Sequence, residues 1–208
     1  MNQQVDDVRT RILTEAIRLF AARGVAGTSI QSIAAAAGIT RPTLVYHFGS
    51  KAGLRTAVLR TVVDHWRAEL PRLLADAASQ GGPRLDALVS AVSNFFRRDP
   101  ALARLIVREM LDHPDELGIM LREELLPWTR LLAEAIRVGQ ASGSLRSDAD
   151  PEAFTTLIIS SALAVVALGA HAGSLVSPAP SVDAQQAELL RVARVALLAP
   201  RKTSPEEG

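Results

Sequence analysis

The chain has 208 residues, no cysteine and a formal net charge of +1, and 48% of its residues are hydrophobic. This length allows a large buried core, either in one extended domain or in a domain of about 50 residues followed by a larger one. The lack of cysteine excludes disulfide bonds and thiolate chemistry. The first residues show neither the basic nor the apolar segment of an export signal, so we expect a cytoplasmic protein.

Apolar residues recur every three or four positions along nearly the whole chain, and this spacing predicts helices and no strands. The first helical pattern runs from Val5 to Phe20. It ends at Arg23 and Gly24, a basic last turn followed by a glycine that stops the helix.

Two short helices around a glycine turn are predicted next. Thr28 followed by Gln31 is a capping-box pattern, which opens a helix that Gly38 ends. Thr40 is the expected cap of the second helix, and Pro42 falls in its first turn, where a missing N–H costs nothing. This arrangement is typical of a DNA-reading helix-turn-helix.

The second of these helices, Arg41 to His47, would be roughly 10 Å long at about 1.5 Å per residue, and a major groove about 12 Å wide admits it end-on. Its outward residues are expected to be Arg41, Thr43, Val45, Tyr46 and His47. A further helix begins at Ser50 and Lys51, and its amides and lysine charge suit a phosphate. Two alternatives stay open, namely that Gln31 only closes the capping box and that Tyr46 belongs partly to the core.

The distribution of charge along the chain agrees with a DNA contact at the helix-turn-helix pattern. Residues 1–60 hold eight lysine and arginine residues against three acidic ones, whereas the remainder holds fifteen against nineteen. The helix-turn-helix pattern therefore lies in the basic part of the chain.

Further helical patterns cover residues 51–73, 85–96, 102–110, 117–140, 151–171 and 183–198. Pro71 predicts a kink or break in the first of them and Pro127 a bend in the fourth, and residues 79–83 read as a linker. We therefore expect an all-α fold of about nine helices. The expected division is a helix-turn-helix domain over residues 1–50, a larger helical domain over 51–200 and a disordered tail over 201–208.

The uncharged stretch over residues 153–182 has two interpretations. Its length would suit a transmembrane helix, but small and polar residues interrupt it and basic flanks are lacking. We favour a helix that its own domain covers on one side and a partner subunit covers on the other. The last helix would be its companion, with Ala193 and Leu197 at the contact between subunits.

Most large, soft side chains lie in the middle helices. They form either a plain hydrophobic core or the lining of a pocket for an apolar ligand. The proposed lining is Trp66, Phe95, Phe96, Met110, His113, Met120, Trp128, Phe154, Ile158 and Ser161. Candidate polar anchors, each of which has an alternative as a solvated or ion-paired residue, are Arg104, Arg108, Glu109, His113 and Thr156.

Catalytic and metal-binding patterns are weak. His65 with Glu69, and His113 within an acidic run, lack a second histidine or a cysteine at ligand spacing. We find no phosphate-cradling glycine loop and no nucleophile motif. We therefore expect no metal, no cofactor and no enzyme activity.

Many short motifs fall together over about residues 8–60, namely Ile12 to Phe20, Gly24, Thr28-Ser29, Ile33-Ala34, Ala37-Gly38-Ile39, Thr43-Leu44, Tyr46-His47-Phe48 and Ser50-Lys51. In these the chain resembles the TetR family of one-component transcriptional regulators. The resemblance implies base contacts from Gln31, Arg41, Pro42 and Thr43, and DNA backbone contacts from Ser29, Tyr46, His47 and Lys51.

One position departs from the family, which usually carries tyrosine where this chain has Val45; the valine offers a methyl contact to thymine instead. The full set of expected DNA-binding residues is Thr28, Ser29, Gln31, Arg41, Pro42, Thr43, Val45, Tyr46, His47 and Lys51.

The resemblance further implies a homodimer through the last two helices, operator DNA as partner, and a small-molecule effector bound between the middle helices. The expected function is a repressor that leaves a palindromic operator when an apolar effector binds. The alternatives are a constitutive DNA-binding module without an effector and a helical enzyme.

Overall fold

The computed structural model describes residues 2–79 and 84–198. The expected tail over 201–208 and most of the expected linker lie outside these ranges. Within them the chain forms helices and no strand, which confirms the predicted all-α class. The helices are α1 (Asn2–Arg23), α2 (Ile30–Ala36), α3 (Arg41–Phe48), α4 (Lys51–Ser79), α5 (Arg84–Arg98), α6 (Pro100–Asp112), α7 (Pro114–Ala141), α8 (Pro151–Gly173) and α9 (Val182–Leu197).

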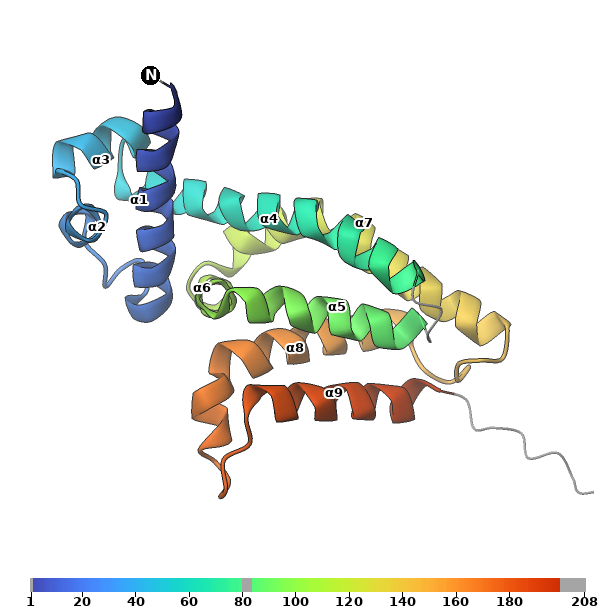
Figure 1. Cartoon of the computed structure of the whole chain (residues 1–208). Coiled ribbons are helices and arrows are strands. Elements are labelled where there is room, and N and C mark those ends of the chain that lie inside the picture. The colour runs from blue at the N-terminus through green and yellow to red at the C-terminus, as the bar shows by residue number, and fades with distance from the viewer. Residues whose placement is uncertain (1, 80–83, 199–208) are drawn as a thin grey trace, which may run out of the picture.

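Helices α1, α2 and α3 form an N-terminal unit at one end of the molecule, and α4 leads from it into a larger group of helices (Figure 1). The unit has a small apolar centre, in which Ile12, Phe20, Ile33 and Leu44 are fully buried. These residues come from all three helices, so their burial fixes how α3 stands on α1 and α2.

The turn between α2 and α3 forms as expected. Gly38 has a φ of +66°, a left-handed conformation that glycine adopts without steric cost. The Thr40 hydroxyl then caps α3 by accepting from the Thr43 amide at 3.3 Å, and Pro42 lies in the first turn.

The start of α2 differs from the prediction. Its cap is Ser29, whose hydroxyl accepts from the Ser32 amide at 3.0 Å, and not Thr28. Thr28 is buried, and its hydroxyl donates to the carbonyls of Gly24 at 2.8 Å and Leu19 at 3.3 Å. The predicted Thr28–Gln31 capping box is therefore wrong, because the Thr28 side chain is used to tie the loop to α1.

The two long helices tolerate their internal prolines. Helix α4 continues through Pro71, so no break occurs at the position where a kink or break was predicted, and α7 continues through Pro127 as one helix. Helix α7 also begins at Pro114, one turn earlier than its apolar pattern indicated. Pro114 is compatible with a first turn, where no intrahelical N–H bond is lost.

Helix α8 lies at the centre of the larger group and packs against α5, α6, α7 and α9. Its segment Pro151–Gly169 is long and apolar enough to cross a membrane by length and composition alone. Helices contact this segment on several sides, and 39% of its apolar window is buried within the protomer.

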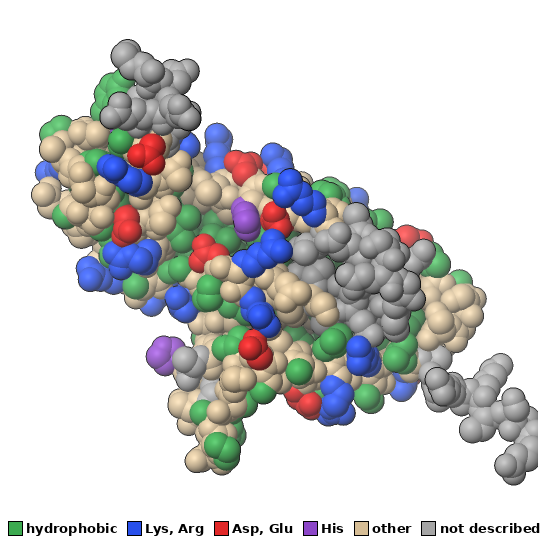
Figure 2. Space-filling model, in the orientation of Figure 1, with side chains coloured by type: hydrophobic (Ala, Val, Ile, Leu, Met, Phe, Trp, Pro, Cys, Tyr) green, Lys and Arg blue, Asp and Glu red, His purple; other side chains and the backbone are tan. Residues whose placement is uncertain are grey.

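The predicted subunit contact through Ala193 and Leu197 needs correction. Both side chains are buried within a single protomer, where they pack with Ile136 of α7 and Ile158 of α8. The exposed large apolar side chains described in α8 and α9 are instead Leu157, Leu168, Val192 and Val195. The stretch between the helices also projects from the body, and Figure 2 shows hydrophobic side chains on this projection.

Candidate nucleic-acid interface and its junction with the larger helical group

Helix α3 presents a continuous exposed face. Arg41, Pro42 and Val45 are exposed, and Tyr46 has 85% of its surface accessible, while Leu44 anchors the helix on its inner side. The alternative that Tyr46 belongs partly to the core is therefore wrong. His47 is half-buried and lies edge-on to Tyr46, with 5.5 Å between the ring centroids.

The other predicted DNA-contacting residues fall into two groups. Ser29 and Gln31 are exposed near the start of α2, and Thr43 is half-buried with its hydroxyl 2.8 Å from that of Thr40. Thr28 does not face outward, because its side chain is only 1% exposed and hydrogen-bonded inward. The Thr28 side chain is therefore not available to contact a ligand on this surface.

Lys51 has a structural role that its sequence position did not reveal. Its ammonium group donates to the carbonyls of Thr28 at 2.9 Å and Ala26 at 3.3 Å. The first turn of α4 is thereby tied to the loop between α1 and α2. Lys51 thus has a structural role beside the phosphate contact, which stays a prediction.

A second contact within the unit was also absent from the sequence analysis. The guanidinium carbon of Arg9 on α1 lies 5.5 Å from the centre of the Phe48 ring at the end of α3. A cation in this position is attracted to the face of the ring. No local spacing connects Arg9 with Phe48, so only the fold brings them together.

Helix α6 holds the end of α1. Arg108 donates from Nε to the carbonyl of Ala21 at 2.9 Å and from Nη2 to that of Ala22 at 3.2 Å. The last carbonyls of a helix lack intrahelical partners and carry partial negative charge, so a guanidinium is well suited to them. Arg108 is therefore occupied at this junction and is not free to anchor an effector.

The next residue of α6 binds α4. Glu109 is 1% exposed, and its Oε2 accepts from Arg55 Nε at 2.7 Å, with Arg55 Nη2 at 2.6 Å from the same oxygen. Arg55 Nη1 donates to Glu116 of α7 at 2.5 Å, and His113 Nδ1 lies 3.5 Å from Glu109 Oε2. We call Arg55, Glu109, His113 and Glu116 the junction cluster.

The ionisation of this cluster follows from its geometry. Burial lowers the pKa of Arg55, but its hydrogen bonds to Glu109 and Glu116 outweigh burial, so the pKa lies above the ordinary value. The hydrogen bond and the charge of Arg55 hold the pKa of Glu116 below its ordinary value. The cluster is thus an ion-paired connection between α4, α6 and α7.

The predicted effector-binding residues separate into buried and exposed groups. Trp66, Phe95 and Phe96 are buried and pack on one another, with ring centroids 4.0 Å apart for Trp66 and Phe95 and 5.3 Å apart for Trp66 and Phe96. Ile158 is also buried. The partly buried members are His113, Met120, Trp128, Phe154 and Ser161.

Met110 and the candidate polar anchors lie elsewhere. Met110 is exposed, so it does not line the interior of this protomer. Arg104 and Thr156 are exposed as well, and the Thr156 hydroxyl donates to the carbonyl of Glu152 at 2.9 Å. For Glu109 and Thr156 the ion-paired or solvated alternative is therefore the one observed.

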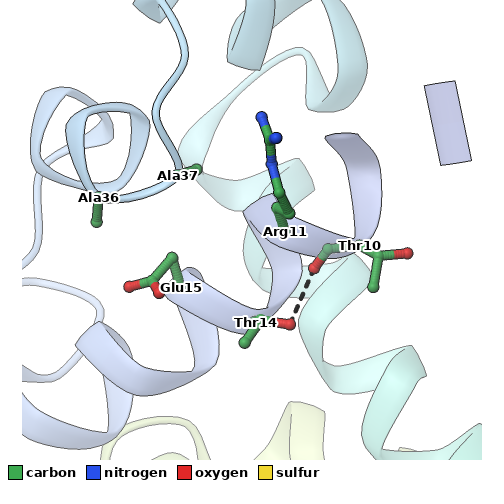
Figure 3. A pocket seen from close by; sticks show the side chains of 6 residues that line it. All are labelled: Thr10, Arg11, Thr14, Glu15, Ala36 and Ala37. Atoms are coloured by element: carbon green, nitrogen blue, oxygen red, sulfur yellow. Dashed lines mark hydrogen bonds between the residues drawn. The ribbon is translucent and has the colours of Figure 1, made fainter. Parts of the chain in front are cut away.

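Two pockets at the surface of the described part of the chain are lined by none of the predicted effector-binding residues. One, of about 180 Å³, lies between α1 and α2 and is lined by Thr10, Arg11, Thr14, Glu15, Ala36 and Ala37 (Figure 3). The other, of about 480 Å³, is lined by Pro127, Arg130, Leu131, Glu134, Arg137 and Glu152. In the lining of the second pocket, Arg137 forms ion pairs with Glu134 and Glu152.

No group of three or more histidine, aspartate or glutamate side chains suited to a metal ion occurs among the residues that the structure describes. The acidic run around His113 contributes to the junction cluster instead.

Comparison with known proteins agrees with both halves of the structure. Residues 12–58 match the bacterial regulatory proteins of the tetR family, and residues 83–194 match the tetracyclin repressor-like C-terminal domain. The chain is 32% identical over 117 residues to the HTH-type transcriptional regulator RutR of Escherichia coli (strain K12), a match that covers 53% of this chain and 51% of RutR. The match thus spans about half the length of that relative.

A longer match is to the HTH-type transcriptional repressor KstR2 of Rhodococcus jostii, which is 29% identical over 69% of this chain and 71% of its own length. Among solved structures, a putative transcriptional regulator from Saccharomonospora viridis in complex with choline superposes with a TM-score of 0.69. Its identity is 24%, over 94% of this chain and all of that one (100%), so it supports the fold.

Proposed function

Since the chain belongs to the TetR family of bacterial transcriptional regulators, we propose that it is a homodimeric repressor that a small, largely apolar molecule releases from a palindromic operator. The observation that supports this most directly is the exposed face of α3, where Arg41, Val45 and Tyr46 stand on a helix short enough for a major groove. In this proposal residues 1–50 bind DNA, residues 51–200 bind the effector and dimerise, and the protein acts in the cytoplasm.

The dimer is supported by the apolar surface of α8 and α9. Leu157, Leu168, Val192 and Val195 are exposed in one protomer and belong to two adjacent helices. Members of the family act as dimers, and a twofold pair of recognition helices reads two half-sites of an inverted repeat.

The effector is supported by the soft side chains around α8 and by what relatives bind. The Saccharomonospora viridis regulator is a complex with choline, and a similarly folded KstR2 of Mycobacterium tuberculosis is named a ketosteroid transcriptional regulator. For this chain we propose a site among α4, α5, α7 and α8, near Trp66, Trp128 and Ile158.

Release would proceed through α6. Arg108 holds the end of α1, and Glu109 holds Arg55 near the start of α4, so a shift of α6 moves both supports of the DNA-reading unit. A ligand changes the DNA affinity only by its preference for the released arrangement, and the coupling acts equally in both directions.

A constitutive DNA-binding module is the second candidate. It is favoured by the mutual packing of Trp66, Phe95 and Phe96, because side chains that fill the interior leave their volume unavailable to a ligand. The two candidates share the DNA interface and differ only in response to small molecules.

The test is a titration of the protein–DNA complex with a panel of apolar and aromatic compounds, followed by DNA anisotropy and tryptophan fluorescence. We expect a compound that releases DNA and alters the emission of Trp66 or Trp128. Its own affinity should fall by the same factor when operator is added, typically about 5- to 150-fold. Constant anisotropy and emission across the panel would favour the constitutive module.

A further inference from the structure

One buried hydroxyl in α8 has no hydrogen-bond partner among the residues that the structure describes. The side chain of Thr155 is 6% exposed, and its Oγ1 is buried and unpaired. Threonines in helices often donate to the carbonyl four residues earlier, as Thr156 does to Glu152 at 2.9 Å and Thr61 does to Ala57 at 3.0 Å. Since most buried hydroxyls in folded proteins have a partner, the exception at Thr155 calls for a physical reason.

Thr155 lies at the boundary between two parts of the core. It shares a helix face with Ile158 and Ile159, which follow it by three and four residues. Ile158 belongs to a small cluster with Ile136 and Leu197, whereas Ile159 packs against the large cluster that contains Trp66 and Phe95. The Thr155 side chain is thus buried on a helix face whose neighbouring residues belong to both clusters.

The surroundings limit the chemistry of a ligand there. The next residues on this face of α8 are Ile158, Ile159 and Ala162, all apolar. Among the described residues, Glu109 is the one charged residue that is buried. It is already paired with Arg55 in the junction cluster. A charged ligand beside Thr155 would therefore meet no described buried countercharge, whereas a carbonyl or hydroxyl group matches a threonine hydroxyl directly.

We propose that Thr155 Oγ1 is the polar anchor of the effector site, and that the effector is a largely apolar compound with one carbonyl or hydroxyl group. This rests on the proposed function and specifies its ligand. The polar group of the ligand completes the hydrogen bonding of Thr155, while its apolar body lies against residues such as Ile158 and Trp128.

The test uses two probe pairs that differ by one polar group, 2-tetralone with tetralin and 2-naphthol with naphthalene, and calorimetric titration of the full chain. Wild type and T155S should bind the polar member of a pair about tenfold more tightly than the apolar one. T155V removes the hydroxyl at nearly constant volume and leaves the polar group of the ligand without a partner, so the polar member should lose its advantage and bind no more tightly than the apolar one. T156V, which changes the neighbouring exposed hydroxyl, is the matched control and should behave like wild type.

Thermal melting without ligand checks that the variants fold. T155V should melt no lower than wild type, because no hydrogen bond is lost. A lower midpoint for T155V would mean that the hydroxyl has a partner in the folded chain and would overturn the proposal. So would a wild type that binds none of the probes, or one that binds both members of each pair equally.

DNA release separates this inference from the proposed function. If 2-tetralone or 2-naphthol releases DNA and T155V keeps the same preference for it, the role of Thr155 is overturned and the effector-responsive repressor stands. If the probes bind through Thr155 but release no DNA, Thr155 stands as an anchor and the proposed release fails.

Discussion

At the scale of single residues, the boundary between α1 and α2 shows how the fold assigns roles to chemically similar neighbours. Thr28 and Ser29 are adjacent hydroxyl residues at a helix start, and either suits a helix cap. The structure uses Ser29 as the cap and buries Thr28 against carbonyls of the α1 end. The two residues should therefore differ in what their substitution affects.

We predict that T28V lowers the free energy of unfolding by about 1–3 kcal/mol, because it leaves the Gly24 and Leu19 carbonyls without their hydroxyl donor. DNA affinity of the folded fraction should stay unchanged. S29A is the matched variant, which should cost about 1 kcal/mol as a lost cap. Urea denaturation measures both, and a T28V protein as stable as wild type would contradict the buried role.

The sequence predicts the role of an interface residue when its contacts lie within the same short segment of the chain. The Gly38 turn, the Thr40 cap and the outward Arg41 follow from spacing within one short segment, and the structure has them as expected. Lys51 differs, since its carbonyl partners lie 23 and 25 residues earlier in the chain. Such contacts depend on packing between elements, which a local pattern does not contain.

At the scale of elements, α6 connects the DNA-reading unit with the rest of the molecule. Its Arg108 and Glu109 are consecutive residues that bind α1 and α4, respectively. The expected helix over residues 102–110 is present, but its role was not predicted, because the partners Ala21 and Arg55 come from distant segments. Periodicity identifies a helix and its inner face, but it does not show which other helices pack against that face.

We predict that Arg55 and Glu109, whose side chains are 11% and 1% exposed, contribute to the free energy of unfolding as a coupled pair. R55M should destabilise the chain by about 3–5 kcal/mol, because it leaves the buried carboxylate of Glu109 without its partner. E109L should cost less, since Arg55 keeps its ion pair with Glu116. The double variant R55M/E109L should cost clearly less than the sum. Additive losses in chemical denaturation would show that the pair does not act as a unit.

A pH dependence follows from Glu116. Because Arg55 holds its pKa below the ordinary value of 4.5 in the folded chain, ionised Glu116 contributes stability above that pH. This contribution is lost as the pH falls through the lower pKa of the folded state. E116Q should therefore be less stable than wild type at neutral pH and equally stable in strong acid. A difference between the two proteins that is independent of pH would rule out this linkage.

At the scale of the whole molecule, the apolar surface of α8 and α9 determines where a second protomer fits. The sequence predicts that both helices need a partner, but it did not separate their inner from their outer residues. Ala193 and Leu197 are inner residues of the protomer, and Val192 and Val195 are outer ones. The short side chains of α8 and α9 are apolar on several faces, so periodicity alone does not distinguish the two sides.

We predict that V195E, which adds a charge to the exposed face, gives a folded monomer with weakened DNA binding. A193E places its charge in the protomer core beside Ile136 and Ile158, and should instead prevent folding. Sedimentation and circular dichroism distinguish these results. A V195E protein that remains a dimer would move the subunit contact away from this face of α9.

The central claim is that a dimer reads operator DNA with the exposed face of α3, and selection of binding sites from random duplexes tests it most directly. Wild type should enrich an inverted repeat, with affinity that falls steeply as salt rises. R41A should relax the preference at one base position in each half-site, at a cost of about 1–3 kcal/mol. Enrichment of no inverted repeat, or an unchanged preference in R41A, would contradict the account.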